Sequence, residues 1–258
     1  MRQLIRHIYL SSVGWFSKIS PGVHIMNSHY LDGPQDEAMD RFYNLLRKLR
    51  SDMEFVNFQD AVEMVSKNNF GNGKYLSFSF DDGYRDNYTS VWPVLRQFNV
   101  NACVFVNPGF IDIKQHNQVN FFAEKHHTKK VRKPMTWEMI RQLASAGFKI
   151  GDHSYNHIDL GILEPAKYPL EILMSKQRIE REIGEPCEYF AWPYGKLHNI
   201  SQPAIDYLLE NYEYIFSSDN SNAYFSYNNE RIINRRHFEA SWPIHHVKYF
   251  LSFRKTTK

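Results

Sequence analysis

Cysteine is scarce in this sequence, and long apolar runs are absent. Cys103 and Cys187 are the only two cysteines among 258 residues, too few for a disulfide framework or a cysteine-based zinc ribbon. Each lies in an apolar run, so we expect two buried free thiols. No apolar stretch reaches the roughly 20 residues that span a bilayer. The basic N-terminal segment also lacks the apolar region and cleavage site of a signal peptide, which predicts a cytoplasmic protein, with membrane-surface contact by that segment as the alternative.

An excess of charge of one sign is also missing. Thirty-one basic and 28 acidic residues leave a net charge of +3, which argues against a general nucleic-acid binder. Hydrophobic residues make up 43% and charged residues 23%, a balance typical of a globular chain with a large core. Aromatic residues reach 16%. This surplus fits either an aromatic core or a site that stacks on sugar rings.

Short apolar runs alternate with amphipathic segments along most of the chain, a pattern that predicts parallel strands joined by helices. We expect strands at Val23–Asn27, Glu54–Asn57, Tyr75–Phe80, Ala102–Val106, Phe148–Gly151, Glu188–Trp192, Tyr214–Ser217 and Arg231–Arg235. Seven or eight such units in this length favour one distorted (β/α) barrel of the α/β class, with seven strands as the expected number. The expected boundaries are an N-terminal extension over residues 1–22 and the barrel over residues 23–258.

One segment, residues 114–134, breaks this alternation. It carries Lys114, Lys125, Lys129, Lys130, Arg132 and Lys133 against the single acid Glu124. Because it follows a predicted strand, we expect a basic loop on the rim of the barrel. It is either a solvated connection or a flap that faces an anionic substrate.

Polar residues of catalytic type follow several predicted strands. His29 comes after the first strand, Asp81 and Asp82 come after Tyr75–Phe80, and His153 and His157 come after Phe148–Gly151. In parallel barrels the C-terminal ends of the strands form one rim, which holds the active site. We therefore expect these side chains to converge.

The chemistry of this set favours a metal. Adjacent carboxylates such as Asp81 and Asp82 repel each other unless a cation or a proton is shared. The spacing of His153 and His157 places both imidazoles on one side of a helical turn. Two histidines and one carboxylate with an open fourth position are typical of catalytic zinc.

These motifs are similar to those of a known family. Ser79–Tyr84 and His153–His157 resemble the first two motifs of the polysaccharide deacetylases, the NodB-like metal-dependent carbohydrate esterases, and Ala191–Gly195 resembles the third. Val23–His29 is similar to the N-terminal strand and histidine of the subgroup that includes poly-N-acetylglucosamine deacetylases. The resemblance covers most of residues 23–240 and implies a NodB-like barrel that removes acetyl groups from sugars, with N-acetyl favoured over O-acetyl.

The resemblance also implies roles for individual residues. Asp82, His153 and His157 would hold one divalent metal, with zinc favoured over cobalt, nickel or manganese. Asp81 would be the general base and His29 the general acid.

The remaining site residues are expected around the third motif. The backbone N–H of Tyr194 would stabilise the oxyanion. Trp192, Pro193 and Tyr194, together with Arg235, are the expected substrate contacts.

The sequence departs from the family pattern in two places. The third motif usually begins with an arginine that orients the base, and Ala191 stands there instead. Arg235, Arg236 and Lys196 are candidates to replace it. The fourth motif has no clear counterpart, and His237 competes with His29 for the role of acid.

Two other functions remain open: a glycan-binding barrel without activity, and a metal-independent glycoside hydrolase using Asp81 with another carboxylate. The expected partner is an acetylated carbohydrate of cell-surface polysaccharide or glycolipid biosynthesis, lipid- or nucleotide-linked, and not a nucleic acid.

Overall fold

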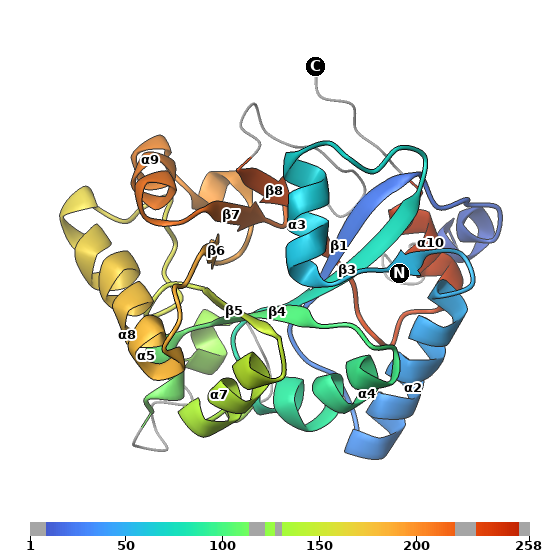
Figure 1. Ribbon diagram of the computed structural model, residues 1–258, viewed down its shortest axis with the longest axis horizontal. Helices are drawn as coiled ribbons and strands as arrows, with labels where there is room; N and C mark the ends of the chain where they lie inside the picture. Colours follow the sequence, from blue (N-terminus) through green and yellow to red (C-terminus); the bar gives the residue numbers. More distant parts are fainter. Residues whose placement is uncertain (1–8, 114–121, 127–130, 220–230, 253–258) are drawn as a thin grey trace.

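The computed structural model describes residues 9–113, 122–126, 131–219 and 231–252. Parallel strands curve around a common axis, and helices cover their outer side (Figure 1). The strands are β1 Gly22–Ser28, β2 Glu54–Phe55, β3 Lys74–Phe80, β4 Ala102–Val106, β5 Lys149–Asp152, β6 Tyr189–Ala191, β7 Tyr214–Ser217, β8 Ile232–Asn234 and β9 Arg236–His237. The predicted (β/α) barrel is confirmed.

The strands pair in the order β8-β7-β6-β5-β4-β3-β1-β9, and β2 pairs with β3 outside this path. The expected seven strands become nine among the described residues. The predicted strand over residues 231–235 is divided at Arg235, and two residues beyond it pair with β1 as β9, with Met26 opposite Arg236. Two-residue strands carry no periodic signal, because period 2 needs several residues to show.

Helices connect most of the strands. They are α2 Gln35–Leu49, α3 Phe58–Ser66, α4 Trp92–Gln97, α5 Pro108–Ile111, α7 Trp137–Ser145, α8 Met174–Ile183, α9 Gln202–Asn211 and α10 Ile244–Leu251. Local sequence explains several ends: Thr136 caps α7 by accepting a hydrogen bond from the Met139 N–H at 3.3 Å, and Gly184 ends α8 with φ 76°. Local capping residues therefore account for both of these helix ends.

Alternation along the strands divides the core into an outer and an inner layer. Outward residues such as Phe78 and Val104 pack with the covering helices. Inward residues such as Ile25, Phe105 and Phe216 pack with each other and with α3. The strand period of two therefore gives each strand one face for the helices and one for the barrel interior.

Helix α3 closes the barrel at the end where the strands begin. Phe58 packs inside against Phe105 and Phe216, with ring centroids 6.2 and 5.4 Å away. Its last residue, Ser66, lies 3.3 Å (Oγ) from the hydroxyl of Tyr214, the first residue of β7. Figure 1 shows α3 between the β1–β3 pair and the β7–β8 pair. The open rim is therefore at the other end, where the strands finish.

The described part of the N-terminal extension packs on the last helix. Leu10 is buried with Tyr249 and Phe250 of α10, and the Ser11 hydroxyl lies 3.1 Å from Nε2 of His246. Among the described residues, no helix is both long enough and apolar enough to cross a bilayer. Cys103 and Cys187 are buried and free, as predicted.

Candidate metal and catalytic site

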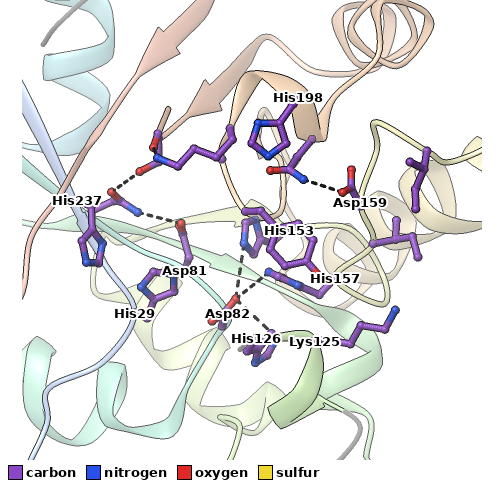
Figure 2. Close-up of a pocket in the computed structure, with 18 residues that line it drawn as sticks. His29, Asp81, Asp82, Lys125, His126, His153, His157, Asp159, His198 and His237 are labelled. Carbon is purple, nitrogen blue, oxygen red and sulfur yellow. Dashed lines mark hydrogen bonds and ion pairs between the residues drawn. The ribbon is translucent and has the colours of Figure 1, made fainter. Parts of the chain in front are cut away.

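The predicted residues meet at the open rim of the barrel. His29 follows β1, Asp81 and Asp82 follow β3, and His153 and His157 follow β5, and all five line one cavity of about 820 Å³. Figure 2 shows Asp82 directed toward His153 and His157, with His29 and Asp81 beside them. The convergence expected from strand ends alone is therefore present.

Asp82 faces the histidines. Its Oδ1 lies 3.6 Å from Nε2 of His153 and 3.4 Å from Nε2 of His157, and the donor atoms of these three buried residues all lie within 4.8 Å of one another. No hydrogen bond reaches Asp82 Oδ1 among the described residues. A buried carboxylate oxygen without such a partner is costly, and a divalent cation among these donors would relieve that cost. The residues present therefore fit a metal.

Backbone contacts fix the orientation of His153. Its Nδ1 lies 2.6 Å from the carbonyl oxygen of Ala191, which can only accept, so Nδ1 carries the proton and Nε2 keeps its lone pair toward Asp82. Asn107 donates to the carbonyl oxygens of His153 and Ser154, at 2.5 and 2.8 Å. Ala191, which stands where the third motif usually has an arginine, thus orients the imidazole of His153 through its backbone carbonyl.

The segment from His153 to His157 is not the helical turn that the spacing predicts. His153 continues the strand direction, and Ser154 and His157 have φ values of 61° and 51°. Among the described residues, only Asn68, Asp82, Asn99, Ser154, His157 and Tyr194 have positive φ without being glycine. Four of these six lie in the site, as is common for strained backbone at functional positions.

Asp81 faces the opposite way, toward Arg235. Its two oxygens accept from Nη1 and Nη2 of Arg235 at 2.6 and 2.9 Å, and Oδ2 also accepts from Asn27 at 3.1 Å. Burial favours the neutral acid, but Arg235 more than compensates, and the pKa of Asp81 lies below its ordinary range. Arg235 therefore takes the place expected of the motif-three arginine, whereas Lys196 donates to the carbonyls of Ser218 and Asp219.

His29 and His237 lie together beside Asp81. Their ring centroids are 5.6 Å apart, and Nε2 of His237 lies 2.9 Å from Oε1 of Glu239. Burial lowers the pKa of His29 to about 4, and the charge of Asp81 opposes this shift only in part. Both candidate acids thus lie on the Asp81 side of the site.

The third motif supplies less of the cavity surface than expected. Tyr194 lines the cavity, and its ring packs edge-on to His157 with centroids 4.8 Å apart. Trp192, Pro193 and Arg235 are buried and are not among the described residues that line the cavity. Their positions therefore do not support the expected contact with substrate.

The basic loop lies partly outside the described residues, and Lys114, Lys129 and Lys130 fall there. Lys125 lines the cavity. The guanidinium of Arg132 instead stacks on the Tyr30 ring at 3.5 Å and bonds to Asp32 at 2.9 Å. His126, the next residue after Lys125, also enters the site, with its Nε2 3.6 Å from Asp82 Oδ1. Sequence reasoning missed His126, because it has no informative spacing to the other histidines.

Several solved structures share this fold. The Streptococcus pyogenes deacetylase PplD in complex with acetate aligns with a TM-score of 0.68 and 16% identity, over 90% of this chain and 97% of that one. IcaB from Ammonifex degensii aligns with a TM-score of 0.68 and 19% identity, over 92% and 99%. A de-N-acetylase from Aggregatibacter actinomycetemcomitans aligns with a TM-score of 0.64 and 18% identity, over 89% and 98%. At these identities the likeness establishes the fold.

Sequence comparison establishes the family. The chain is 25% identical over 148 residues to YxkH of Bacillus subtilis strain 168, named as a polysaccharide deacetylase, in a match that covers 57% of this chain and 47% of that protein. The chain thus matches about half the length of this curated relative. The family model for polysaccharide deacetylase matches residues 68–210, a range that contains Asp81, Asp82, His153 and His157. The chain belongs to the polysaccharide deacetylase family, hydrolases that act on acetylated sugars.

Proposed function

We propose that the protein is a metal-dependent deacetylase that removes N-acetyl groups from a sugar or glycan precursor. The observation that carries this proposal is the division of labour between Asp82, which faces the imidazoles, and Asp81, which Arg235 holds ionised. Asp82, His153 and His157 would hold the ion, with zinc favoured over cobalt, nickel or manganese. When bound there, a divalent metal polarises an acetyl carbonyl and acidifies a water.

In this proposal Asp81 takes the proton of the attacking water. Its two oxygens already accept from Arg235 and Asn27, but each carboxylate oxygen has two lone pairs, so one remains for the water. The fixed orientation supports the role, because a general base must lie within hydrogen-bond reach of the proton that it takes. The N–H of Tyr194 would donate to the oxygen on which negative charge develops.

His29 would supply the proton to the leaving nitrogen. Because burial lowers its pKa to about 4, it would gain that proton during the reaction rather than hold it beforehand. An amine is a poor leaving group unless it is protonated, so an acid on the Asp81 side favours an amide over an activated ester as substrate. The reaction consumes water and an acetamido group and yields acetate and a free amine. The name of the Aggregatibacter de-N-acetylase agrees with this preference.

The test is acetate release from acetylated sugar oligomers by chelated protein, with and without added zinc. We expect release only with metal in the wild type, and none from Asp82→Asn. Metal-independent cleavage of glycosidic bonds would favour the hydrolase alternative. Binding of glycan with no acetate release under any metal would favour the inactive barrel.

We propose a lipid surface as a second partner, in keeping with a lipid-linked substrate. Trp15 and Phe16 are 75% and 89% exposed, and Tyr9 is 54% exposed, and such aromatic residues favour membrane interfaces. The double variant Trp15→Ser, Phe16→Ser should lose sedimentation with anionic vesicles. The exposed Leu170, which lies in a different part of the chain, gives the control Leu170→Ser. Equal sedimentation of all three proteins, or none by the wild type, would contradict this proposal.

A further inference from the structure

The cavity extends beyond the candidate metal site along the segments that follow β5 and β6. Asp159 of the first segment and Asn199 of the second both line it. Figure 2 shows Asp159 on the opposite side of His157 from His29. Asp159 comes two residues after His157, so their Cα atoms lie within about 7 Å of each other. A group bound at Asp159 would therefore be close to the metal-binding side chains, in a part of the cavity that none of the roles proposed above involves.

Backbone contacts fix these two segments to each other. Leu160 and Ile200 form a parallel β-bridge, and the Ser201 N–H donates to the carbonyl oxygen of Leu160 at 3.2 Å. The segments approach so closely that a Cβ atom at Gly161 would clash with the carbonyl oxygen of His198. This wall of the cavity is thus formed before any ligand arrives, which reduces the entropy that binding must cost.

Neutral donors hold the carboxylate of Asp159 in place. Its Oδ1 accepts from the backbone N–H of Gly161 at 2.8 Å, and its Oδ2 accepts from Nδ2 of Asn199 at 2.6 Å. Each carboxylate oxygen has two lone pairs, so each can accept one more hydrogen bond. Lys196, which also lines the cavity, donates to two backbone carbonyls instead. Among the described residues, no arginine, lysine or histidine nitrogen lies within 4.0 Å of the Asp159 oxygens, so that part of the chain supplies no counter-charge at this distance.

Exposed apolar and aromatic side chains stand on the same wall. The side chain of Ile162 is 82% exposed although it lines the cavity, and the exposed ring of His198 lines it too. A sugar ring has apolar C–H faces and a polar edge, so it suits an apolar surface beside a few fixed polar groups. An ammonium group on that edge suits a carboxylate better than a hydroxyl does, because hydrogen bonds between charged groups are roughly twice as strong as neutral ones.

We propose that Asp159 binds the ammonium group of an amino sugar that has already lost its acetyl group. This inference rests on the proposed function, because deacetylation is the reaction that turns a neutral acetamido group into such an amine. A glycan chain then lies across the cavity, with an acetylated unit at the metal side and a deacetylated unit at Asp159. The substrate class is therefore a chain of amino sugars that is already partly deacetylated.

The test uses methyl glucosaminide and methyl glucoside, which differ only in an ammonium group against a hydroxyl group, at a pH where the amine is protonated. Neither carries an acetyl group, so no turnover intervenes. Ligand-observed NMR measures their binding to protein saturated with Zn²⁺, which occupies the carboxylate of the metal site. We expect the wild type to bind the amino sugar about tenfold more tightly, and Asp159→Asn and Asp159→Ala to lose this difference. Asp40→Asn, which removes an exposed aspartate of α2, makes the same change in net charge and should keep it.

Equal binding of the two sugars by the wild type, or binding of neither, would overturn the inference. So would a preference for the amino sugar that persists in both Asp159 variants, because another group then binds the ammonium. In each of these cases acetate release still decides the proposed deacetylation separately. If the wild type releases no acetate but keeps the preference, the proposed function fails and the ammonium site stands. Thermal unfolding checks that the variants are folded, and the asparagine variant decides the matter if the alanine variant is not.

Discussion

Asp81 and Asp82 are neighbours in the chain but occupy opposite environments. Asp81 accepts three charged or amide hydrogen bonds from Arg235 and Asn27. Asp82 Oδ1 has no hydrogen bond among the described residues, only imidazoles at 3.4 to 3.6 Å. Burial and the charge of Asp81 raise the pKa of Asp82, whereas the pKa of Asp81 is lowered. The protein thus satisfies both oxygens of Asp81 itself and leaves one oxygen of Asp82, Oδ1, for a ligand to satisfy.

The largest effect on metal binding and turnover should come from replacing Asp82. Asp82→Asn should abolish stoichiometric metal binding and lower kcat by about 10³-fold or more, because the Lewis acid is lost. The same change should raise the Tm of the chelated protein, since it replaces a buried carboxylate, which the charge of Asp81 repels, by a neutral amide. Elemental analysis and thermal unfolding in chelator check both effects. A lower Tm in chelator would show that Asp82 is satisfied without metal.

The matching substitution at Asp81, whose two oxygens are both hydrogen-bonded, should lower the stability of the protein. Asp81→Asn should keep the metal and lower kcat by about 10²–10⁴-fold, because an amide cannot take the proton of water. It should also destabilise the protein by about 3 kcal/mol, since the buried Arg235 loses its counter-charge. Denaturant unfolding measures this cost. Equal stability of the wild type and Asp81→Asn would show that Arg235 needs no charged partner.

A smaller effect separates the two candidate acids. His29→Gln should slow hydrolysis of N-acetyl sugars by about 10²-fold but leave activated aryl acetates nearly unchanged, because a phenolate leaves without protonation. His237→Gln is the control, since His237 lies beside His29 and bonds to Glu239. If His237→Gln shows the dependence on leaving group and His29→Gln does not, the roles are reversed.

A further effect is on stability as a function of pH. The pKa of His29 is about 4 in the folded protein, against about 6.5 when unfolded, so the unfolded state binds the proton more tightly. Stability is therefore full above pH 6.5 and falls as the pH drops toward 4, by up to about 3 kcal/mol from this group. His29→Gln should remove this part of the acid loss. If the free energy of unfolding changes equally with pH in the wild type and in His29→Gln between pH 4 and 7, this prediction is wrong.

The sequence predicts those parts of the structure that depend on local pattern. Alternation over Tyr75–Phe80 shows a strand with two faces, and the polar residues that follow each strand must then meet at one rim. The pairing of Asp81 with Arg235 joins residues 154 positions apart. Arginine suits the site, but no local period selects Arg235 over Arg236. Such contacts depend on the tertiary fold, so the sequence could only name candidates.

The same dependence on the tertiary fold explains why the sequence did not predict two features of the site. The spacing of His153 and His157 suits a helical turn, but Ser154 and His157 adopt positive φ, which their spacing does not reveal. His126 lies in a segment without periodicity, and only its hydrogen bond to Tyr84 and its aromatic neighbours place it. A histidine beside an aromatic residue is too common a pattern to identify a residue of the site.

The closed lower end of the barrel has a consequence for the order of events. Phe58, Phe105 and Phe216 fill the interior below the site, and Arg235 stacks on Phe105 at 4.7 Å, so these side chains obstruct any passage toward α3. In the proposed deacetylation, sugar and acetate would then share the one open end of the barrel. Acetate is therefore expected to compete with the incoming substrate, and product inhibition by acetate measures this.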